Sequence, residues 1–534
     1  MDRAALSMAV AVPVGRDWSS EPRGPRTAMT APPRQTVLLM TDATRWDMLG
    51  SYRETGVRTP HLDRLAESGT RFERAYTTQP VCAPARSALF TGTWPHSNGT
   101  WANSLAPGLD VPTLGQRLRE QDIAAGYIGK WHLDGTDYFG NGRCPDGWDP
   151  EFWYDMRSYL EELTPEERRA SRDPDTVDDP GVESGFTYAH RCTERAMDFV
   201  EQHSDEDFLL VVSYDEPHDP GITPPEFAYR YRDFVFPYDE NVAEGLEGKP
   251  EHQRVWAGPR LAEDRSGGYE RRDARYFAAQ EFVDGQLGRV LDAVERHAPG
   301  ALVIYTSDHG DMLGSHRLHA KGPAMYDEIA RVPLLVRLPG ITAPGTVSPH
   351  PVSHIDLAPT VLAHAGMEVP EFLAGRSLLP ALADPAHRIN AEIFVEFGRY
   401  EVDHDGFGGF QPMRGVFDGR YKLVVNLLSD DELYDLGDDP GELRNLIGDP
   451  AHSARRDRLH DRILEWMNET RDPFRGTYWE RRPWRGDARA ATWAYDGMTR
   501  GRPADPGHQP RQLDYATGLE AAEAVRPKEA PRVP

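Results

Sequence analysis

The stretch Thr36-Val37-Leu38-Leu39-Met40, followed by Thr41 and Asp42, decides the fold class of this chain. A continuous run of this kind, without alternating charged residues, suits a strand that is buried on both faces of a parallel sheet. The run ends close to a carboxylate, so the predicted strand carries a charged group at its carboxyl end. Open α/β sheets bind their ligands at that edge.

Three further runs have the same layout, with polar residues close behind each of them. They are Phe208–Val212 before His218, Ala301–Tyr305 before Asp308 and His309, and the weaker Ile123–Ile128 before Lys130 and His132. Helical patterns lie between the runs, among them Thr59–Gly69 and Ala274–His297. This alternation predicts a layered α/β domain whose motifs meet at one edge of the sheet.

The composition limits the partners of the chain. It has 534 residues and a formal net charge of -26, from 60 basic and 86 acidic side chains. This balance disfavours nucleic acid and anionic membranes, and an anionic substrate must meet a locally basic pocket. No apolar run approaches the roughly 20 residues of a membrane helix, and the N-terminus has no secretory pattern. Three cysteines are too few for a disulfide framework, so a soluble, cytoplasmic protein is expected.

The chain divides into four predicted parts. These are a flexible tail at 1–34, a large α/β domain at 35–389, a smaller α+β domain at 390–480 and an irregular tail at 481–534. Short strand-like pieces, Ala391–Glu396 and Tyr421–Asn426, and a helix near Ala454–Met467 predict the small domain. The last tail is rich in Arg, Pro, Gly and Ala, and we expect partial disorder there.

Cys82 begins the stretch Cys82-Ala83-Pro84-Ala85-Arg86, and Pro84 suits the first turn of a helix. At a helix N-terminus the positive end of the backbone dipole stabilises an anion, and Arg86 lies one turn further along. Both features are expected to lower the pKa of the Cys82 thiol. Taken alone, a buried cysteine beside a structural arginine is the commoner arrangement.

Together with Leu89-Phe90-Thr91-Gly92, the Cys82–Arg86 stretch resembles the signature of the type I sulfatase family. The similarity continues in Ile128–His132 and in three later blocks, Arg331–Leu334, His354–Thr360 and Glu432–Leu436. The resemblance implies an alkaline-phosphatase-like fold, with a mixed, mostly parallel sheet sandwiched by helices and residues 35–389 as the catalytic domain. It also implies that a formylglycine-generating enzyme oxidises Cys82 to formylglycine.

Asp42, Asp308 and His309 offer hard oxygen ligands and one imidazole, which suit a divalent cation. Taken singly, each aspartate is equally well explained as a helix cap or a loop carboxylate. The resemblance implies that these three residues bind a metal together with the modified residue 82, and calcium is the usual family metal. Ala43 stands where many sulfatases place a second carboxylate, which leaves magnesium and manganese as alternatives.

The resemblance also implies a catalytic set, although a lone lysine or histidine is more often structural. The set is Cys82, Arg86, Lys130, His132, His218 and Lys321. In the implied hydrolysis of a sulfate monoester, the hydrated formylglycine attacks sulfur and forms a sulfo-enzyme, while cationic groups hold the sulfate oxygens. His218 protonates the leaving alcohol, and His132 helps the second hydroxyl of the hydrate to expel sulfate.

Two other functions use the same residues. A phosphonate monoester or phosphodiester hydrolase of the same superfamily shares the formylglycine, the metal and the Asp-His pair, but Lys130 and His132 favour sulfate. A non-catalytic binder of sulfated glycans would have no use for a nucleophile. The expected substrate is a small-molecule or saccharide sulfate ester, recognised by loops such as Tyr400–Arg414. The motifs specify neither the individual ester nor the oligomeric state.

Overall fold

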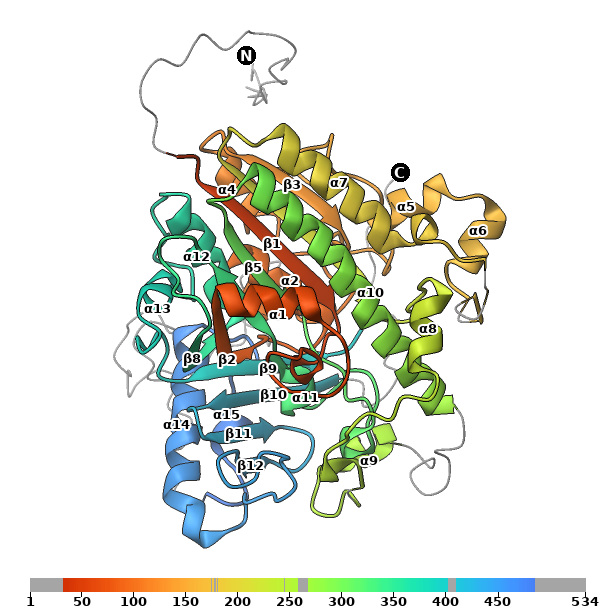
Figure 1. Ribbon diagram of the computed structural model, residues 1–534. Helices are drawn as coiled ribbons and strands as arrows, with labels where there is room; N and C mark the ends of the chain where they lie inside the picture. Colours follow the sequence, from red (N-terminus) through yellow and green to blue (C-terminus); the bar gives the residue numbers. More distant parts are fainter. Residues whose placement is uncertain are drawn as a thin grey trace, which may run out of the picture.

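The computed structural model describes residues 32–485, apart from 174, 177–178, 180, 244, 258–267 and 402–409. Most of both predicted tails therefore lies outside the described residues. Residues 402–409 of the proposed recognition loop, Tyr400–Arg414, also lie outside them. The predicted domain limits at 35, 389 and 480 stay predictions. The described part contains two sheets, one of eight strands and one of four, and Figure 1 shows how helices surround them.

The large sheet has the order β3-β4-β1-β5-β7-β2-β6, and β8 pairs with β2. Its strands are β1 (Gln35–Asp42), β2 (Thr70–Tyr76), β3 (Ala124–Gly129), β4 (Phe208–Pro217), β5 (Leu302–Ser307), β6 (Arg331–Val332), β7 (Leu334–Arg337) and β8 (Thr346–Ser353). The four strands predicted from their apolar runs, β3, β4, β1 and β5, are parallel neighbours. The predicted convergence of their carboxyl ends is thereby confirmed.

The sheet is mixed, as the resemblance implied. β7 runs antiparallel to both β5 and β2, and β6 runs antiparallel to β2, whereas β8 is parallel to β2. The antiparallel strands lie on one side of β5, away from the β3-β4-β1 side. The parallel part of the sheet therefore carries the polar strand ends.

All eight residues of β1 are buried, which explains its uninterrupted run. Val37 and Leu39 belong to one hydrophobic core, and Leu38 and Met40 belong to a second core on the opposite face. Val37 lies between Leu210 of β4 and Val303 of β5 in the register. Fully burying one such side chain contributes about 1.5–3 kcal/mol before entropic costs, so β1 anchors both helix layers.

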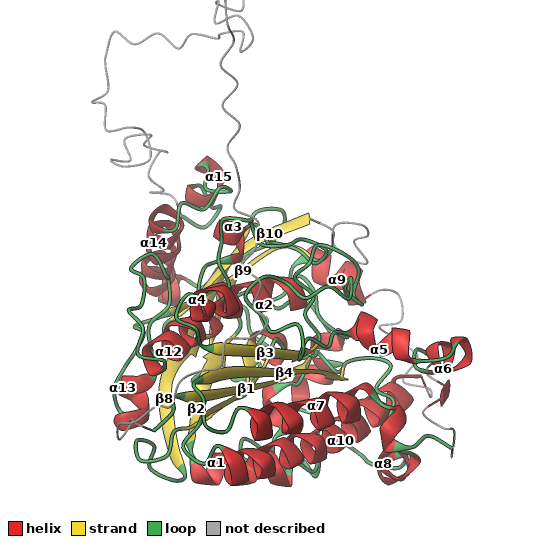
Figure 2. Cartoon of the chain, turned by 90° about the horizontal axis from the view of Figure 1, so that it is seen from above, coloured by secondary structure: helices red, strands yellow, loops and turns green. Residues whose placement is uncertain are grey.

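Helices cover both faces of the sheet (Figure 2). The first layer consists of α1 (Pro60–Ser68), α7 (Tyr188–Gln202) and α10 (Gly268–His297). The second layer consists of α2 (Cys82–Thr91), α4 (Leu114–Arg119) and α12 (Leu357–His364). The predicted helices Thr59–Gly69 and Ala274–His297 match α1 and α10, and Thr59 and Gly69 are the capping residues of α1. The sandwich predicted from the resemblance is thus the observed architecture.

The second sheet is antiparallel, with the order β12-β11-β10-β9. Its strands are β9 (Ile393–Arg399), β10 (Phe410–Phe417), β11 (Tyr421–Asn426) and β12 (Glu432–Asp435). The helix α14 (Ser453–Glu469) packs against it, and the Trp466 indole stacks on the Phe394 ring with centroids 4.8 Å apart. The predicted strand at Tyr421–Asn426 is β11, and the strand predicted from Ala391 begins at Ile393.

Candidate active site

Four adjacent strand ends bring the predicted site residues together. Asp42 ends β1, His218 follows β4, Lys130 and His132 follow β3, and Asp308 and His309 follow β5. At the end of β3 only glycine fits, because a Cβ on Gly129 would lie 1.9 Å from the Ser213 carbonyl oxygen. This close approach allows the Lys130 amide to donate a hydrogen bond to Ser213 (2.8 Å). The glycine therefore fixes the direction in which the Lys130–His132 segment leaves the sheet.

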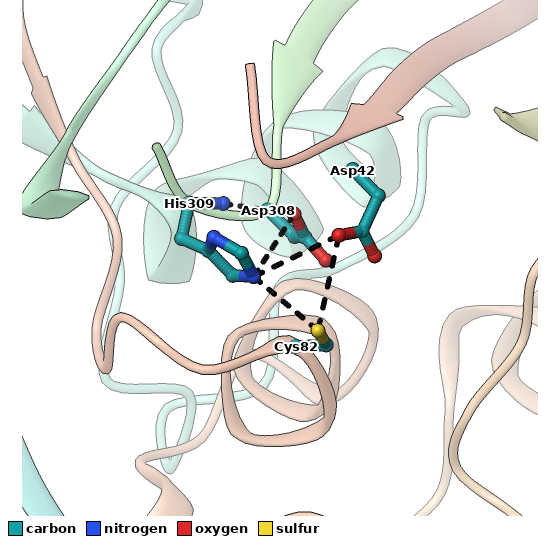
Figure 3. A group of neighbouring side chains, drawn as sticks. All are labelled: Asp42, Cys82, Asp308 and His309. Carbon is teal, nitrogen blue, oxygen red and sulfur yellow. Dashed lines mark hydrogen bonds and ion pairs between the residues drawn. The ribbon is translucent and has the colours of Figure 1, made fainter. Parts of the chain in front are cut away.

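Asp42, Cys82, Asp308 and His309 form one buried group, in which one ligand atom of each residue lies within 4.8 Å of all the others (Figure 3). The Cys82 Sγ lies 3.3 Å from His309 Nε2 and 3.9 Å from Asp42 Oδ1. His309 Nε2 lies 3.7 Å from Asp308 Oδ1. The resemblance implies that these four residues bind a metal, and their oxygen, nitrogen and sulfur donors lie close enough together to share one ion.

The orientation of His309 suits a ligand. Its Nδ1 donates to the carbonyl oxygen of Gly310 (2.7 Å), because a carbonyl can only accept. Nε2 therefore faces Asp42, Asp308 and Cys82, and it is free of a proton whenever the ring is neutral. A histidine that binds a metal is commonly fixed in this way by a hydrogen bond from its other nitrogen.

Arg86 holds the two carboxylates in place. Its fully buried guanidinium donates to Asp42 Oδ2 (3.1 Å) and Asp308 Oδ2 (3.0 Å), and also to Ser213 Oγ and the Lys130 carbonyl. The other oxygens, Oδ1 of both aspartates, face His309. The hydrogen bonds of Arg86 thus hold the two carboxylates, and its charge also interacts with Cys82.

Ala43 occupies the turn that follows Asp42. Its φ of 67° is left-handed, an arrangement that costs an alanine about 1 kcal/mol. The Ala43 amide donates to Asp308 Oδ1 (3.1 Å), and its carbonyl accepts from the Tyr276 hydroxyl (2.7 Å). The backbone of residue 43 therefore orients one carboxylate, although its side chain offers no ligand.

Cys82 is buried at the first position of α2, as predicted. Burial and the charge of Asp42 raise the pKa of its thiol. The charges of Lys321, Lys130 and His309 lower the pKa by more than this, so that it falls to about 6. The two lysines come from distant segments of the chain and add to the lowering expected from the helix N-terminus and Arg86, whose charge also interacts with Cys82.

Two buried ammonium groups face this acidic group. The Lys130 Nζ lies 2.6 Å from Asp42 Oδ2 and 3.2 Å from Asp215 Oδ1. Burial lowers the pKa of Lys321, but the charges of Cys82, Tyr400 and Asp42 raise it above its usual value. Both lysines are therefore cationic, and within an acidic protein they provide the local positive charge that an anionic substrate requires.

The two histidines are neutral in this environment. Burial lowers the pKa of His132 to about 3, with further lowering by Lys130 and Arg86. Its Nδ1 is buried and has no hydrogen-bond partner among the described residues. For His218, burial, Lys321 and Lys130 hold the pKa well below its usual value. A bound anion that compensates the two lysines would raise the pKa of both rings.

Tyr138 and Asp215 belong to the same site and were not predicted. The Tyr138 hydroxyl donates to Asp215 Oδ1 and lies 3.3 Å from His218 Nδ1, and the Lys130 Nζ lies 3.9 Å from the Tyr138 ring centroid. Asp215 follows an apolar run, which was a usable signal. Tyr138 lies in an irregular loop, and its nearness to the Lys130–His132 block was the available hint.

Other polar residues have structural partners, as expected. Asp47 pairs with Arg45 and Arg53, and Asp311 accepts from the amides of Leu313 and Ala320. A second buried group, His96, Glu396 and Asp472, already surrounds a cation. The Arg414 Nε lies 2.6 Å from Asp472 and 3.8 Å from Glu396.

The three cysteines of the chain, Cys82, Cys144 and Cys192, are all free. Across the described ranges, no helix combines the length and apolar character needed to cross a membrane.

Comparison with known proteins identifies the family. The model described as Sulfatase matches residues 34–367, and the model described as N-sulphoglucosamine sulphohydrolase, C-terminal, matches residues 314–469. The chain is 44% identical over 490 residues to an uncharacterized sulfatase, YidJ, of Escherichia coli, and the match covers 90% of this chain and 96% of the relative.

Two solved structures have the same fold. One is a protein in complex with its substrate D-glucosamine-2-N,6-O-disulfate, with a TM-score of 0.68, 21% identity and coverage of 82% of this chain and 98% of the other. The second is a phosphonate monoester hydrolase of Agrobacterium radiobacter, with a TM-score of 0.67, 23% identity and coverage of 82% and 96%. The chain belongs to the sulfatase family and has an alkaline-phosphatase-like fold. It is a sulfuric ester hydrolase.

Proposed function

We propose that the chain hydrolyses an organic sulfate monoester with formylglycine at position 82 as nucleophile and a divalent cation bound by Asp42, residue 82, Asp308 and His309. The convergence of these four donors around the N-terminus of α2 is the observation that carries this proposal. The donor set fits a cation because the negative charge of the Asp308 carboxylate is disfavoured in the metal-free site. Burial and the charge of Asp42 raise the pKa of Asp308 to about 6.

The bound cation supplies positive charge that polarises the sulfate oxygens and residue 82. The remaining work belongs to the side chains of the chain itself. Lys130 and Lys321 hold the sulfate oxygens and neutralise charge on them. Arg86 fixes the orientation of the Asp42 and Asp308 carboxylates through its two ion pairs. These groups are fixed by burial, so the site needs little rearrangement when charge develops.

His218 is the proposed general acid. Its ring is neutral in the free enzyme because burial, Lys321 and Lys130 hold its pKa well below the usual value. A sulfate monoanion between the lysines reverses this effect, so the ring gains a proton when substrate is bound. His218 then delivers that proton to the departing alkoxide oxygen.

His132 is the proposed base for the release of sulfate. Its low pKa keeps an electron pair available, and its buried Nδ1 has no hydrogen-bond partner among the described residues. A neutral imidazole can take the proton from the second hydroxyl of the hydrated aldehyde. That transfer restores the aldehyde as sulfate leaves, and it explains why an unmodified cysteine would not turn over.

We infer that the substrate is a small-molecule or saccharide sulfate ester. One neighbour of the same fold was solved with a sulfated glucosamine, and the buried cations Lys130 and Lys321 suit an anionic ester. Calcium is the first candidate for the metal, but only two carboxylates contribute, since residue 43 is alanine. Magnesium and manganese are therefore tested beside it. Modification of Cys82 by a formylglycine-generating enzyme and a cytoplasmic location belong to the same proposal.

A phosphonate monoester hydrolase is the alternative, because one such enzyme shares the fold. Parallel assays with 4-nitrophenyl sulfate, bis(4-nitrophenyl) phosphate and 4-nitrophenyl phenylphosphonate separate the two. We expect the sulfate ester to give the highest kcat/KM, because the two lysines suit a compact tetrahedral anion. A higher kcat/KM for either phosphorus ester would reject the proposed preference.

A further inference from the structure

Tyr138 contacts three of the proposed catalytic groups. Its ring lies beneath the Lys130 ammonium, packs edge-on against His132 with centroids 5.8 Å apart, and packs at a tilt of 32° against His218 with centroids 5.2 Å apart. The side chain is half-buried in the loop that follows β3. A residue so placed sets the mutual positions of these three groups.

The hydroxyl of Tyr138 links His218 to a carboxylate. Burial and the charge of Asp215 hold the pKa of Tyr138 well above its usual value, so the phenol keeps its proton. That proton is donated to Asp215 Oδ1, and the oxygen lone pair remains available to His218 Nδ1 at 3.3 Å. Nδ1 must itself carry a proton, because it also lies 3.0 Å from the Asp219 carbonyl oxygen, which can only accept.

The contacts therefore form a chain in which the His218 Nδ1–H is shared between the Asp219 carbonyl and the Tyr138 oxygen, and the Tyr138 O–H donates to Asp215. A carboxylate at the end of such a chain polarises the phenol and stabilises positive charge on the imidazole. It also leaves Nε2 of His218 as the atom that exchanges a proton with substrate. The Lys130 Nζ lies 3.2 Å from the same Asp215 oxygen, Oδ1.

We propose that Tyr138 is a positioning residue which, together with Asp215, holds His218 in the orientation and charge state required of the general acid. The inference rests on the proposed function, since His218 acts as acid only in that mechanism. It explains why a tyrosine, and not a phenylalanine, covers Lys130. It also predicts an effect that depends on the leaving group, which a purely structural role would not produce.

Several charged groups act on His218, and the expected pH effect has to include all of them. Lys321 and Lys130 disfavour the imidazolium, whereas Asp42 and the Asp219 carbonyl favour it. Arg172, Asp215 and Glu216 line the same small cavity as His218. Removal of the Tyr138 hydroxyl leaves these charges in place but disconnects Asp215, so the imidazolium in the enzyme–substrate complex should lose its proton at a lower pH.

The test compares Tyr138→Phe, which loses the hydroxyl alone, with Tyr138→Leu, which also loses the ring over Lys130. Each variant is assayed on 4-nitrophenyl sulfate, whose leaving group needs little protonation, and on an alkyl sulfate, which needs much. For Tyr138→Phe we expect kcat on the alkyl ester to fall about 10-fold or more, a modest part of what a general acid contributes. The activated aryl ester should change by less than about twofold, because its leaving group is weakly basic.

The alkaline limb of the kcat profile on the alkyl ester should move to lower pH in Tyr138→Phe, since activity needs the protonated ring. Tyr138→Leu should add a rise in KM for both esters, because Lys130 loses its support. Phe139→Leu is the matched control. Phe139 lies beside Tyr138 in the same loop and packs on its ring at 5.4 Å, but carries no hydroxyl, so the ratio of rates on the two esters should stay at the wild-type value.

Asp215→Asn provides a second measurement that does not depend on how well the tyrosine variants fold. It should reproduce the selective loss of activity on the alkyl ester. In the double variant, the ratio of the rates on the two esters should change no more than it does in Tyr138→Phe alone. Equal losses on both esters in Tyr138→Phe, an unmoved alkaline limb, or additive effects would overturn the role of Tyr138. If the wild-type protein hydrolysed neither sulfate ester, the proposed function would fail instead, and the two failures are thus distinguishable.

Discussion

Replacing Arg86 with methionine tests whether its guanidinium allows two carboxylates to be buried side by side. The arginine makes four hydrogen bonds, two of them to Asp42 and Asp308. Without it, Asp42 keeps Lys130 as counter-ion, but Asp308 keeps hydrogen bonds only from the Ala43 and His309 amides within the described part of the chain. Removing one partner of a buried ion pair costs about 3–5 kcal/mol, and we expect a loss of this size in the free energy of unfolding.

The loss should depend on pH in a defined direction. Burial and Asp42 already raise the pKa of Asp308 from 3.8 to about 6 in the folded protein, and the loss of Arg86 raises it further. A carboxyl whose folded pKa is raised destabilises the protein when ionised, and protonation removes that cost as the pH falls through the folded pKa. The difference in the free energy of unfolding between variant and wild type should therefore be largest in mildly alkaline buffer. It should become smaller as the pH falls towards 6.

Urea denaturation of the metal-free proteins, followed by circular dichroism and tryptophan fluorescence, measures this gap. Arg86→Lys should lose less, because it keeps one charge. Arg414→Met is the matched control, since Arg414 is equally buried and pairs with Asp472 away from the proposed metal site. Calcium or manganese should narrow the gap for Arg86→Met and not for Arg414→Met. A change of less than about 1 kcal/mol in Arg86→Met, within the ordinary range of single substitutions, would refute the reasoning.

Three further outcomes follow from the same site. Cys82→Ser should keep the fold but lose multiple turnover, and intact-mass measurement should find a trapped sulfo-enzyme; steady turnover near the wild-type rate would contradict a formylglycine mechanism. His218→Ala should reduce kcat/KM on an alkyl sulfate by about 100-fold and on 4-nitrophenyl sulfate far less, and equal losses would exclude His218 as the acid. His309→Ala should abolish the thermal stabilisation that a divalent cation gives the wild type, about 2.7 kcal/mol at a concentration 100 times its Kd; unchanged stabilisation in calorimetry would place the cation elsewhere.

The parallel part of the sheet and its polar edge could be predicted because the signal is local. Uninterrupted runs such as Val37–Met40 have a single favourable environment, between two helix layers, and the residues behind them are bound to meet at one edge. The antiparallel strands β7 and β6 were not predicted. They are two to four residues long, and their direction is set by pairing with β5 and β2 and not by their own sequence.

The same distinction separates the site residues that were found from those that were missed. Asp42, Asp308 and His309 follow strands directly, so strand position alone places them. Tyr138 reaches the site through an irregular loop. In this loop, Asp134 accepts hydrogen bonds from the amides of Thr136 and Asn141. The role of Arg86 also required the structure, because a helical position does not reveal which carboxylates a long, flexible side chain will meet.

The central claim is that residue 82 is a formylglycine in the active enzyme. Mass spectrometry of the proteolytic peptide that contains residue 82, from protein produced with a formylglycine-generating enzyme and active on 4-nitrophenyl sulfate, tests it most directly. We expect a peptide with the mass of formylglycine in place of cysteine, in a fraction that rises in proportion to kcat across preparations. A fully active preparation whose peptide carries only the unmodified Cys82 thiol would contradict it.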